Sequence, residues 1–227
     1  LPIIYLSAIN MKHYFEGLHE DNHFEMGARQ PSASIWIGTK SRIAAHNDFP
    51  DNLAFVAAGR RQFTVFPPRE FKNLYIGPVD NTPAGRAISM VDFHKPDFEK
   101  HPRFARALEA AQITVLEPGD AIHIPSTWWH HVEGLEPFNV LVNYWWRDTP
   151  KYLGSPQIAL NHAMMTIRDL PEGEKQYWRD TFDYYVFKND SKVTDHIPQH
   201  GHGVLGPMTV STASKIRSFL IKMLSHE

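Results

Sequence analysis

The sequence predicts a mainly β protein, a jelly-roll barrel followed by a helical segment at the C-terminal end. Up to about residue 146, short apolar or alternating stretches recur between Pro and Gly turns, a spacing typical of sandwiches and closed barrels. Beyond residue 150 the apolar residues recur with helical spacing instead. We therefore expect a catalytic β domain at residues 1–150 and a helical segment at residues 151–227.

The predicted strands are separated by turns such as Pro67-Pro68 and Pro118-Gly119. In order, the strands are 1–10, 34–38, 53–58, 61–66, 113–116, 121–124, 129–132 and 138–146. The stretches 53–58 and 61–66 are so close that they are expected to pair as a hairpin. Residues 69–110 show little strand character. Because a connection of this length is often a lid or binding loop, we expect it to form the substrate-facing wall.

The C-terminal segment predicts three helices. An apolar stripe runs from Ile158 to Ile167, Pro171 is placed to open a second helix, and Ser211 is placed to cap the last one. The last helix carries a strong apolar stripe at Ile216, Phe219, Leu220, Met223 and Leu224. This stripe serves either as internal core or as a dimer face, and its length favours a homodimer.

Composition excludes several classes of function. Apolar residues make up 42% and charged residues 21%, which is ordinary for a globular protein. The formal net charge is −2 without a basic run, so nucleic-acid binding is not expected. No apolar run reaches bilayer length and no signal peptide is visible, so no membrane association is expected. The absence of cysteine fits a reducing, cytoplasmic location. Because the chain starts at Leu1 and not Met, we expect a natural N-terminal part to precede it.

The run His46-x-Asp48 carries half of a candidate metal site. Residues i and i+2 of a strand point to the same face, so the imidazole and the carboxylate are expected to lie together. Two histidines and one carboxylate form the ligand set typical of non-heme Fe(II) oxygenases. The third ligand is expected at His130, which follows an aromatic pair on a distant strand, whereas His131 points to the other face. The predicted metal ligands are therefore His46, Asp48 and His130.

Such an oxygenase needs a source of electrons, and a keto acid that chelates the metal is a common one. The distal carboxylate of that acid requires a buried cation. Arg61 fits, because alternation places it on one strand face with Phe63 and Val65. Asn52 and Asn143 are expected to add hydrogen bonds within the same pocket.

Ordered motifs extend these features over about two-thirds of the chain. They are His46-x-Asp48 with Asn52, Gly59-Arg-Arg61 leading into Phe66-Pro-Pro68, Leu74-Tyr75, Val91-Asp-Phe-x-x-Pro-Asp-Phe98, Pro118-Gly-Asp120, Ile124-Pro-x-x-Trp-Trp-His-His131 and Val142-Asn-Tyr-Trp145. Residues 5–146 thereby resemble the JmjC-related, cupin-type 2-oxoglutarate oxygenases. They are most similar to the asparaginyl hydroxylases of that group and to bacterial cupin-like relatives.

The resemblance implies a double-stranded β-helix that binds Fe(II) through His46, Asp48 and His130. It implies that Arg61 and Tyr5 hold the distal carboxylate of 2-oxoglutarate, with the two pocket asparagines lining the co-substrate site. The implied reaction hydroxylates a C–H of a peptide or protein side chain and yields succinate and CO2. The resemblance also implies a homodimer formed by the C-terminal helices.

Three positions depart from the asparaginyl hydroxylases. Those enzymes have Thr where this chain has Ile43, and an Arg-Gln pair that clamps the target amide where this chain has Ala87 and Ile88. The resemblance therefore implies the metal and co-substrate machinery but not asparagine specificity.

Two other functions remain open at this stage. One is a metal-dependent cupin enzyme that acts on a small molecule without a keto acid, and the other is a non-catalytic regulator. The loop histidines His196, His200 and His202 offer a second metal site, against the alternative of a solvated loop.

Overall fold

A computed structural model of the chain describes residues 2–22, 24–82, 85–188 and 190–225. Leu1 of the first predicted strand and Pro83 of the predicted wall lie outside the described residues. The chain divides into two compact units, Leu1–Asp148 and Thr149–Glu227. Within the described ranges, no helix combines the length and apolarity that crossing a membrane requires.

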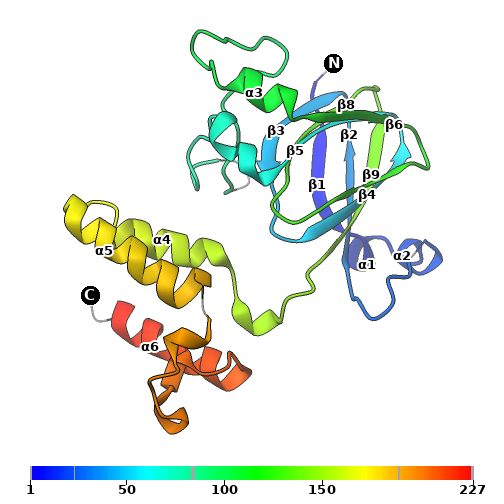
Figure 1. Cartoon of the computed structure of the whole chain (residues 1–227). Helices are drawn as coiled ribbons and strands as arrows, with labels where there is room; N and C mark the ends of the chain where they lie inside the picture. Colours follow the sequence, from blue (N-terminus) through cyan, green and yellow to red (C-terminus); the bar gives the residue numbers. More distant parts are fainter. Residues whose placement is uncertain (1, 23, 83–84, 189, 226–227) are drawn as a thin grey trace. The chain divides into compact units, whose positions relative to one another are not determined.

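The first unit consists of two antiparallel sheets (Figure 1). Their strands are β1 (Tyr5–Asn10), β2 (Ser32–Gly38), β3 (Ser41–Asn47), β4 (Asp51–Ala58), β5 (Arg61–Phe66), β6 (Gln112–Leu116), β7 (Ala121–Ile124), β8 (Trp129–Gly134) and β9 (Asn139–Trp146). One sheet has the order β1-β2-β9-β4-β7 and the other β3-β8-β5-β6. From β2 to β5, and again from β6 to β9, the chain alternates between the sheets, which confirms the double-stranded β-helix.

The expected hairpin between residues 53–58 and 61–66 is wrong. β4 pairs with β7 and β9, whereas β5 pairs with β6 and β8 in the opposite sheet. The short link at Gly59 therefore carries the chain from one sheet to the other. Gly59 has φ +73, and a Cβ there would lie 2.5 Å from the Asn139 side chain and from the Phe138 carbonyl oxygen. Only glycine fits this corner without strain.

The core of the first unit lies between the two sheets. Its buried apolar side chains come from both inner faces: Ala54, Val56, Phe63, Val65, Leu116, Ile124, Val132 and Leu141. Two short helices, α1 (Met11–Tyr14) and α2 (Leu18–Asp21), follow β1. Met11 of α1 joins Ala33, Ile35 and Tyr144 in a separate buried cluster.

The connection between β5 and β6, where a substrate-facing wall was expected, has structure of its own. It contains a 3-10 turn at Pro68–Asn73 and helix α3 (Phe104–Glu109), which the sequence did not predict. α3 is only six residues long and has no side-chain cap, so it lacks the usual sequence signals. Phe104 packs with Phe66 and Trp129 of the four-stranded sheet, so part of the connection covers that sheet.

The second unit contains the three predicted helices, α4 (Pro156–Thr166), α5 (Glu172–Phe182) and α6 (Val210–Leu224). The predicted cap at Ser211 is wrong. The Thr209 side chain accepts a hydrogen bond from the Thr212 N–H, so α6 begins before Ser211. A π-helical turn at Asp183–Lys188 extends α5, and short 3-10 turns occur at Lys151–Leu153, Ser191–Val193, Gln199–Gly201 and Gly203–Leu205.

Candidate metal centre and co-substrate pocket

The β3–β8 ladder places two histidines opposite each other. His46 of β3 is the register partner of His130 of β8, although the chain separates them by most of the barrel. The register shifts between Ile43 and His46. Ile43 pairs with Val132 and His46 pairs with His130, so three residue steps along β3 lie opposite two steps along β8. This irregularity is a β-bulge. Strict alternation would put Ile43 and His46 on opposite faces, whereas the bulge lets both line one cavity.

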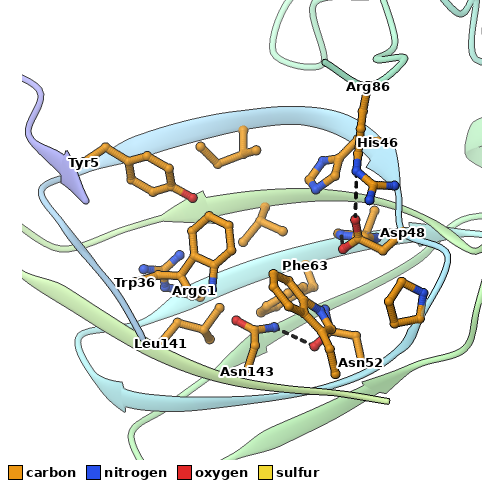
Figure 2. Close-up of a pocket in the computed structure, with 15 residues that line it drawn as sticks. Tyr5, Trp36, His46, Asp48, Asn52, Arg61, Phe63, Arg86, Leu141 and Asn143 are labelled. Carbon is orange, nitrogen blue, oxygen red and sulfur yellow. Dashed lines mark hydrogen bonds and ion pairs between the residues drawn. The ribbon is translucent and has the colours of Figure 1, made fainter. Parts of the chain in front are cut away.

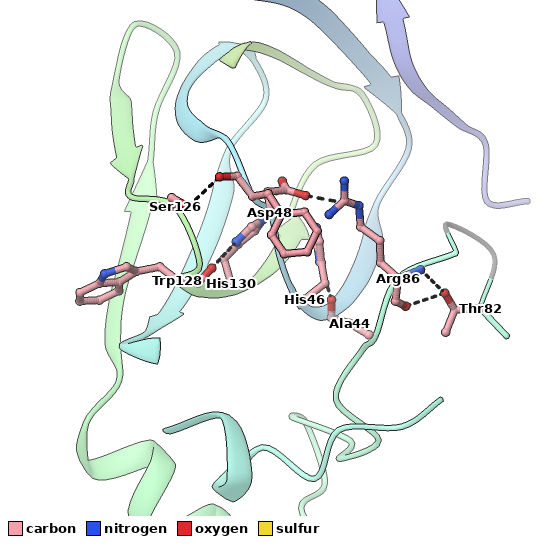
Figure 3. A network of polar contacts seen from close by, with 9 residues as sticks. Ala44, His46, Asp48, Thr82, Arg86, Ser126, Trp128 and His130 are labelled. Atoms are coloured by element: carbon pink, nitrogen blue, oxygen red, sulfur yellow. Dashed lines mark hydrogen bonds and ion pairs between the residues drawn. The ribbon is translucent and has the colours of Figure 1, made fainter. Parts of the chain in front are cut away.

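Asp48 completes the cluster from the loop directly after β3. One ligand atom from each of His46, Asp48 and His130 lies within 4.8 Å of the others. Asp48 Oδ2 is 3.8 Å from His130 Nε2. The loop is held by the segment before β8, because the Thr127 N–H donates to the Asp48 carbonyl at 2.9 Å. The Ser126 hydroxyl adds a second bond, to the Phe49 carbonyl at 2.6 Å (Figure 3).

Backbone carbonyls fix how both imidazoles are protonated. His46 Nδ1 lies 2.9 Å from the Ala44 carbonyl oxygen, and His130 Nδ1 lies 3.3 Å from that of Trp128. A carbonyl only accepts, so each Nδ1 donates, and each Nε2 keeps its lone pair. Burial and the neighbouring His46 lower the pKa of His130 from 6.5 to about 3, so this ring is neutral at physiological pH. Two imidazoles and one carboxylate are a donor set that fits Fe(II) or a similar divalent ion.

The metal cluster lies at one end of a cavity of about 210 Å³ inside the barrel. Figure 2 shows His46, Asp48 and Arg86 at this end, and Tyr5 and Arg61 at the other. The cavity is lined by inner-face residues of both sheets. The fold therefore separates a metal-binding end from a cationic end within one compartment.

Arg61 is buried, with 2% of its surface exposed. Burial lowers the pKa of its guanidinium, and the Tyr5 hydroxyl beside it opposes this effect. Burial likewise raises the pKa of Tyr5, while Arg61 counters the rise. Both groups thus line the same end of the cavity in a poorly solvated place, where an anion would be bound strongly.

Several polar atoms of this cavity have no partner. Among the described residues, buried Arg61 Nε, Trp36 Nε1, Trp145 Nε1 and Asn143 Oδ1 form no hydrogen bond. The Asn143 amide does donate to Asn52 Oδ1. Unsatisfied buried polar groups are costly, and three of these four atoms are donors. Their common location fits an acidic, oxygen-rich ligand such as 2-oxoglutarate.

The structure brings all seven predicted site residues to this cavity: Tyr5, His46, Asp48, Asn52, Arg61, His130 and Asn143. His131 points elsewhere, as alternation predicted, with Nε2 3.2 Å from Glu133 Oε1 and its ring against Phe93. Among the described residues, the loop histidines His196, His200 and His202 do not gather as metal ligands.

Sequence reasoning missed Arg86 and Trp36, which also line the cavity. Arg86 directly precedes Ala87 and Ile88, the two positions where the asparaginyl hydroxylases have the Arg-Gln pair that clamps the target amide. Neither of those forms part of the lining: Ala87 packs beside the Phe66 cluster, and Ile88 forms an isolated bridge with His46. The sequence feature that could have indicated Arg86 is a basic residue just before the motif that begins at Val91.

The family described as "Cupin-like domain" matches residues 1–152. The chain belongs to this family. The match confirms the resemblance to JmjC-related cupin-type proteins, and several relatives agree with it.

The chain is 28% identical over 185 residues to the "tRNA wybutosine-synthesizing protein 5" of chicken (Gallus gallus). This match covers 75% of this chain and 52% of that protein. It is 32% identical over 172 residues to "Lysine-specific demethylase JMJ31" of Arabidopsis thaliana, covering 74% of this chain and 28% of that protein. A solved cupin superfamily protein from Desulfitobacterium hafniense is 11% identical, with a TM-score of 0.28, and covers 65% of this chain and 79% of that one. The chain thus spans about half the first relative's length and about a quarter of the second's.

Proposed function

We propose that this chain is an Fe(II)- and 2-oxoglutarate-dependent oxygenase that hydroxylates a C–H of a peptide or protein side chain. One observation carries the proposal. A single barrel cavity holds two imidazoles and a carboxylate at one end and the buried Arg61 at the other. A cupin enzyme without a keto acid has no need for the second feature.

The proposed reaction consumes 2-oxoglutarate, O2 and the substrate R–H, and yields succinate, CO2 and R–OH. Bound Fe(II) supplies the oxidative decarboxylation of the keto acid and the oxidation of the C–H bond. The chain's own part is orientation and shielding. Arg61 and Tyr5 position the distal carboxylate, and the apolar walls at Ile43, Phe63 and Leu141 restrict water.

Substrate is proposed to enter at the metal end. The Asp48 side chain is 15% exposed and that of Arg86 41% exposed, whereas Arg61 is buried at the opposite end. The names of relatives include a lysine-specific demethylase and a tRNA wybutosine-synthesizing protein, which supports oxygenase-type chemistry without fixing the target. A peptide or protein target is supported by the resemblance and by the lack of a basic run in the sequence.

The test is binding of Fe(II) and 2-oxoglutarate without oxygen, followed by succinate formation when oxygen is admitted. We expect iron-dependent succinate from the wild type, and loss of metal binding in His46→Ala. The matched control is His123→Ala, because that side chain is 51% exposed. No 2-oxoglutarate binding by the iron-loaded wild type, or metal binding unchanged in His46→Ala, would overturn the assignment.

We also propose that the C-terminal helices form a homodimer. In the described part of residues 149–227, the only buried apolar side chains are Val193 and Ala213. On α6 alone, the residues Phe219, Leu220, Ile221, Met223 and Leu224 are exposed. An apolar surface of this kind is typical of an interface, and a second copy carries the same surface. Light scattering after size exclusion should give twice the chain mass, and Phe219→Glu should give the monomer.

A further inference from the structure

Arg86 is held at the metal end of the cavity by its own segment. The Thr82 hydroxyl donates to the Arg86 carbonyl at 2.6 Å and accepts from the Arg86 N–H at 2.9 Å (Figure 3). Just beyond, Ile88 bridges to His46, and the Ser89 N–H donates to the Ala45 carbonyl at 2.7 Å. Both sides of Arg86 are thus tied, one to Thr82 and one to β3. The backbone of Arg86 is therefore held in a fixed position beside β3, the strand that carries His46.

The guanidinium itself is weakly engaged. Arg86 Nε lies 4.0 Å from Asp48 Oδ1, beyond hydrogen-bonding distance, and the guanidinium carbon lies 5.2 Å from the centre of the Phe49 ring. By contrast, Arg60 reaches Glu136 at 2.7 Å. Among the described residues, no hydrogen bond involves the Arg86 guanidinium. Its N–H groups, partly exposed and stacked over a ring, remain available to another acceptor.

In the ligand-free chain the nearest counter-charge of Arg86 is Asp48 at 4.0 Å, but the charge balance of the loaded site leaves Arg86 unmatched. Among the described residues, the acidic and basic side chains that line the cavity are Asp48, Arg61 and Arg86. In the loaded site, the two charges of Fe(II) and that of Arg61 are balanced by dianionic 2-oxoglutarate and Asp48. One positive charge then remains, on Arg86, at the end where the substrate is proposed to enter.

We propose that Arg86 is a specificity-determining residue that binds a carboxylate of an acidic peptide, carried on the oxidised residue or on one beside it. This inference rests on the proposed function. An acidic peptide suits the site better than a nucleic acid does, because one arginine offers a single charge and the chain, at net −2, has no basic run. A carboxylate also matches the planar guanidinium geometrically.

The experiment measures peptide binding to the full chain loaded with Zn(II) and 2-oxoglutarate, because zinc does not support oxidation. The probes are three fluorescent pools of short peptides with random flanks and a central Glu, Gln or Lys. We expect the Glu pool to bind about 10-fold more tightly than the Gln pool, as for a charge-assisted hydrogen bond. Arg86→Ala should remove this preference, and Arg86→Glu should transfer it to the Lys pool. Arg69→Ala is the matched control, since Arg69 is 74% exposed and outside the cavity.

Several outcomes would overturn the proposal. One is equal binding of the Glu and Gln pools by the wild type, or no binding of either. Another is an Arg86→Ala variant that loses Zn(II) affinity but keeps the Glu preference, which would make Arg86 a positioning residue for Asp48. Tighter, Arg86-dependent binding of an RNA oligonucleotide would replace the peptide by a nucleic acid. Failure of the proposed function is distinguishable, because it appears in the same samples as absent 2-oxoglutarate binding, before any peptide is added.

Discussion

Replacing Arg61 by Met should change stability and co-substrate affinity in opposite directions. Met preserves much of the length of the side chain but removes its charge. In the ligand-free protein, the guanidinium is buried, its Nε has no hydrogen-bond partner, and Tyr5 is the group that supports its charge. Exchanging a poorly compensated buried charge for an apolar group of similar volume is often neutral or stabilising, here by about 1–3 kcal/mol.

Binding of 2-oxoglutarate should suffer strongly from the same change. A bidentate carboxylate contact contains two charge-assisted hydrogen bonds, each contributing about 1.5–3 kcal/mol. Their loss corresponds to roughly a 10²- to 10⁴-fold weaker affinity. The stabilisation that wild type gains from added 2-oxoglutarate should therefore disappear in Arg61→Met.

The assay combines urea unfolding with calorimetric titration of 2-oxoglutarate into the Zn(II)-loaded protein. Arg60→Met is the matched control, because Arg60 is the adjacent residue, is half exposed, and pairs with Glu136 on the surface. The control should change neither reading appreciably. If Arg61→Met bound 2-oxoglutarate as wild type does, or lost several kcal/mol of stability without ligand, the guanidinium would be structural and the reasoning refuted.

Three further predictions concern the metal cluster and the fold. The pKa of His130 is about 3 in the folded state, against 6.5 when unfolded. The metal-free protein should therefore keep this contribution to stability above pH 6.5 and lose roughly 1 kcal/mol for each pH unit as the pH falls from 6.5 towards 3. Urea unfolding at several pH values measures this slope, and an equal slope in His130→Asn would contradict the prediction. Gly59→Ala should destabilise by more than about 1 kcal/mol, because its Cβ would clash at Asn139; an unchanged melting temperature would show that the corner can relax. Phe104→Ala should cost about 3–5 kcal/mol in urea unfolding, since the ring is fully buried, whereas an exposed Phe98→Ala should cost far less.

Much of the barrel could be predicted from the sequence, because alternation and turn residues are local signals. The same local rule separated His130 from His131, whereas Asp48 reaches His46 from the loop after β3 and not from the strand that the rule assumed. The prediction of a hairpin between residues 53–58 and 61–66 was wrong because a short link also suits a corner between two sheets. The pairing partners of both strands come from distant parts of the chain. The bulge in β3, the carbonyls that fix both imidazoles, and the position of Arg86 depend on contacts between segments far apart in the chain. Such contacts leave no pattern in a single sequence.

The ladder that sets His46 opposite His130 has a consequence for how the barrel holds together. These residues lie 84 positions apart on neighbouring strands, in a chain without any cysteine. A divalent ion held by both histidines would act as a reversible cross-link between β3 and β8. In the loop-closure treatment used for disulfides, fastening a loop of this length restricts the unfolded chain by about 4–5 kcal/mol. Binding of the ion would therefore stabilise the pairing of β3 with β8 in the four-stranded sheet. Removal of the ion would destabilise the barrel, beginning at the metal site.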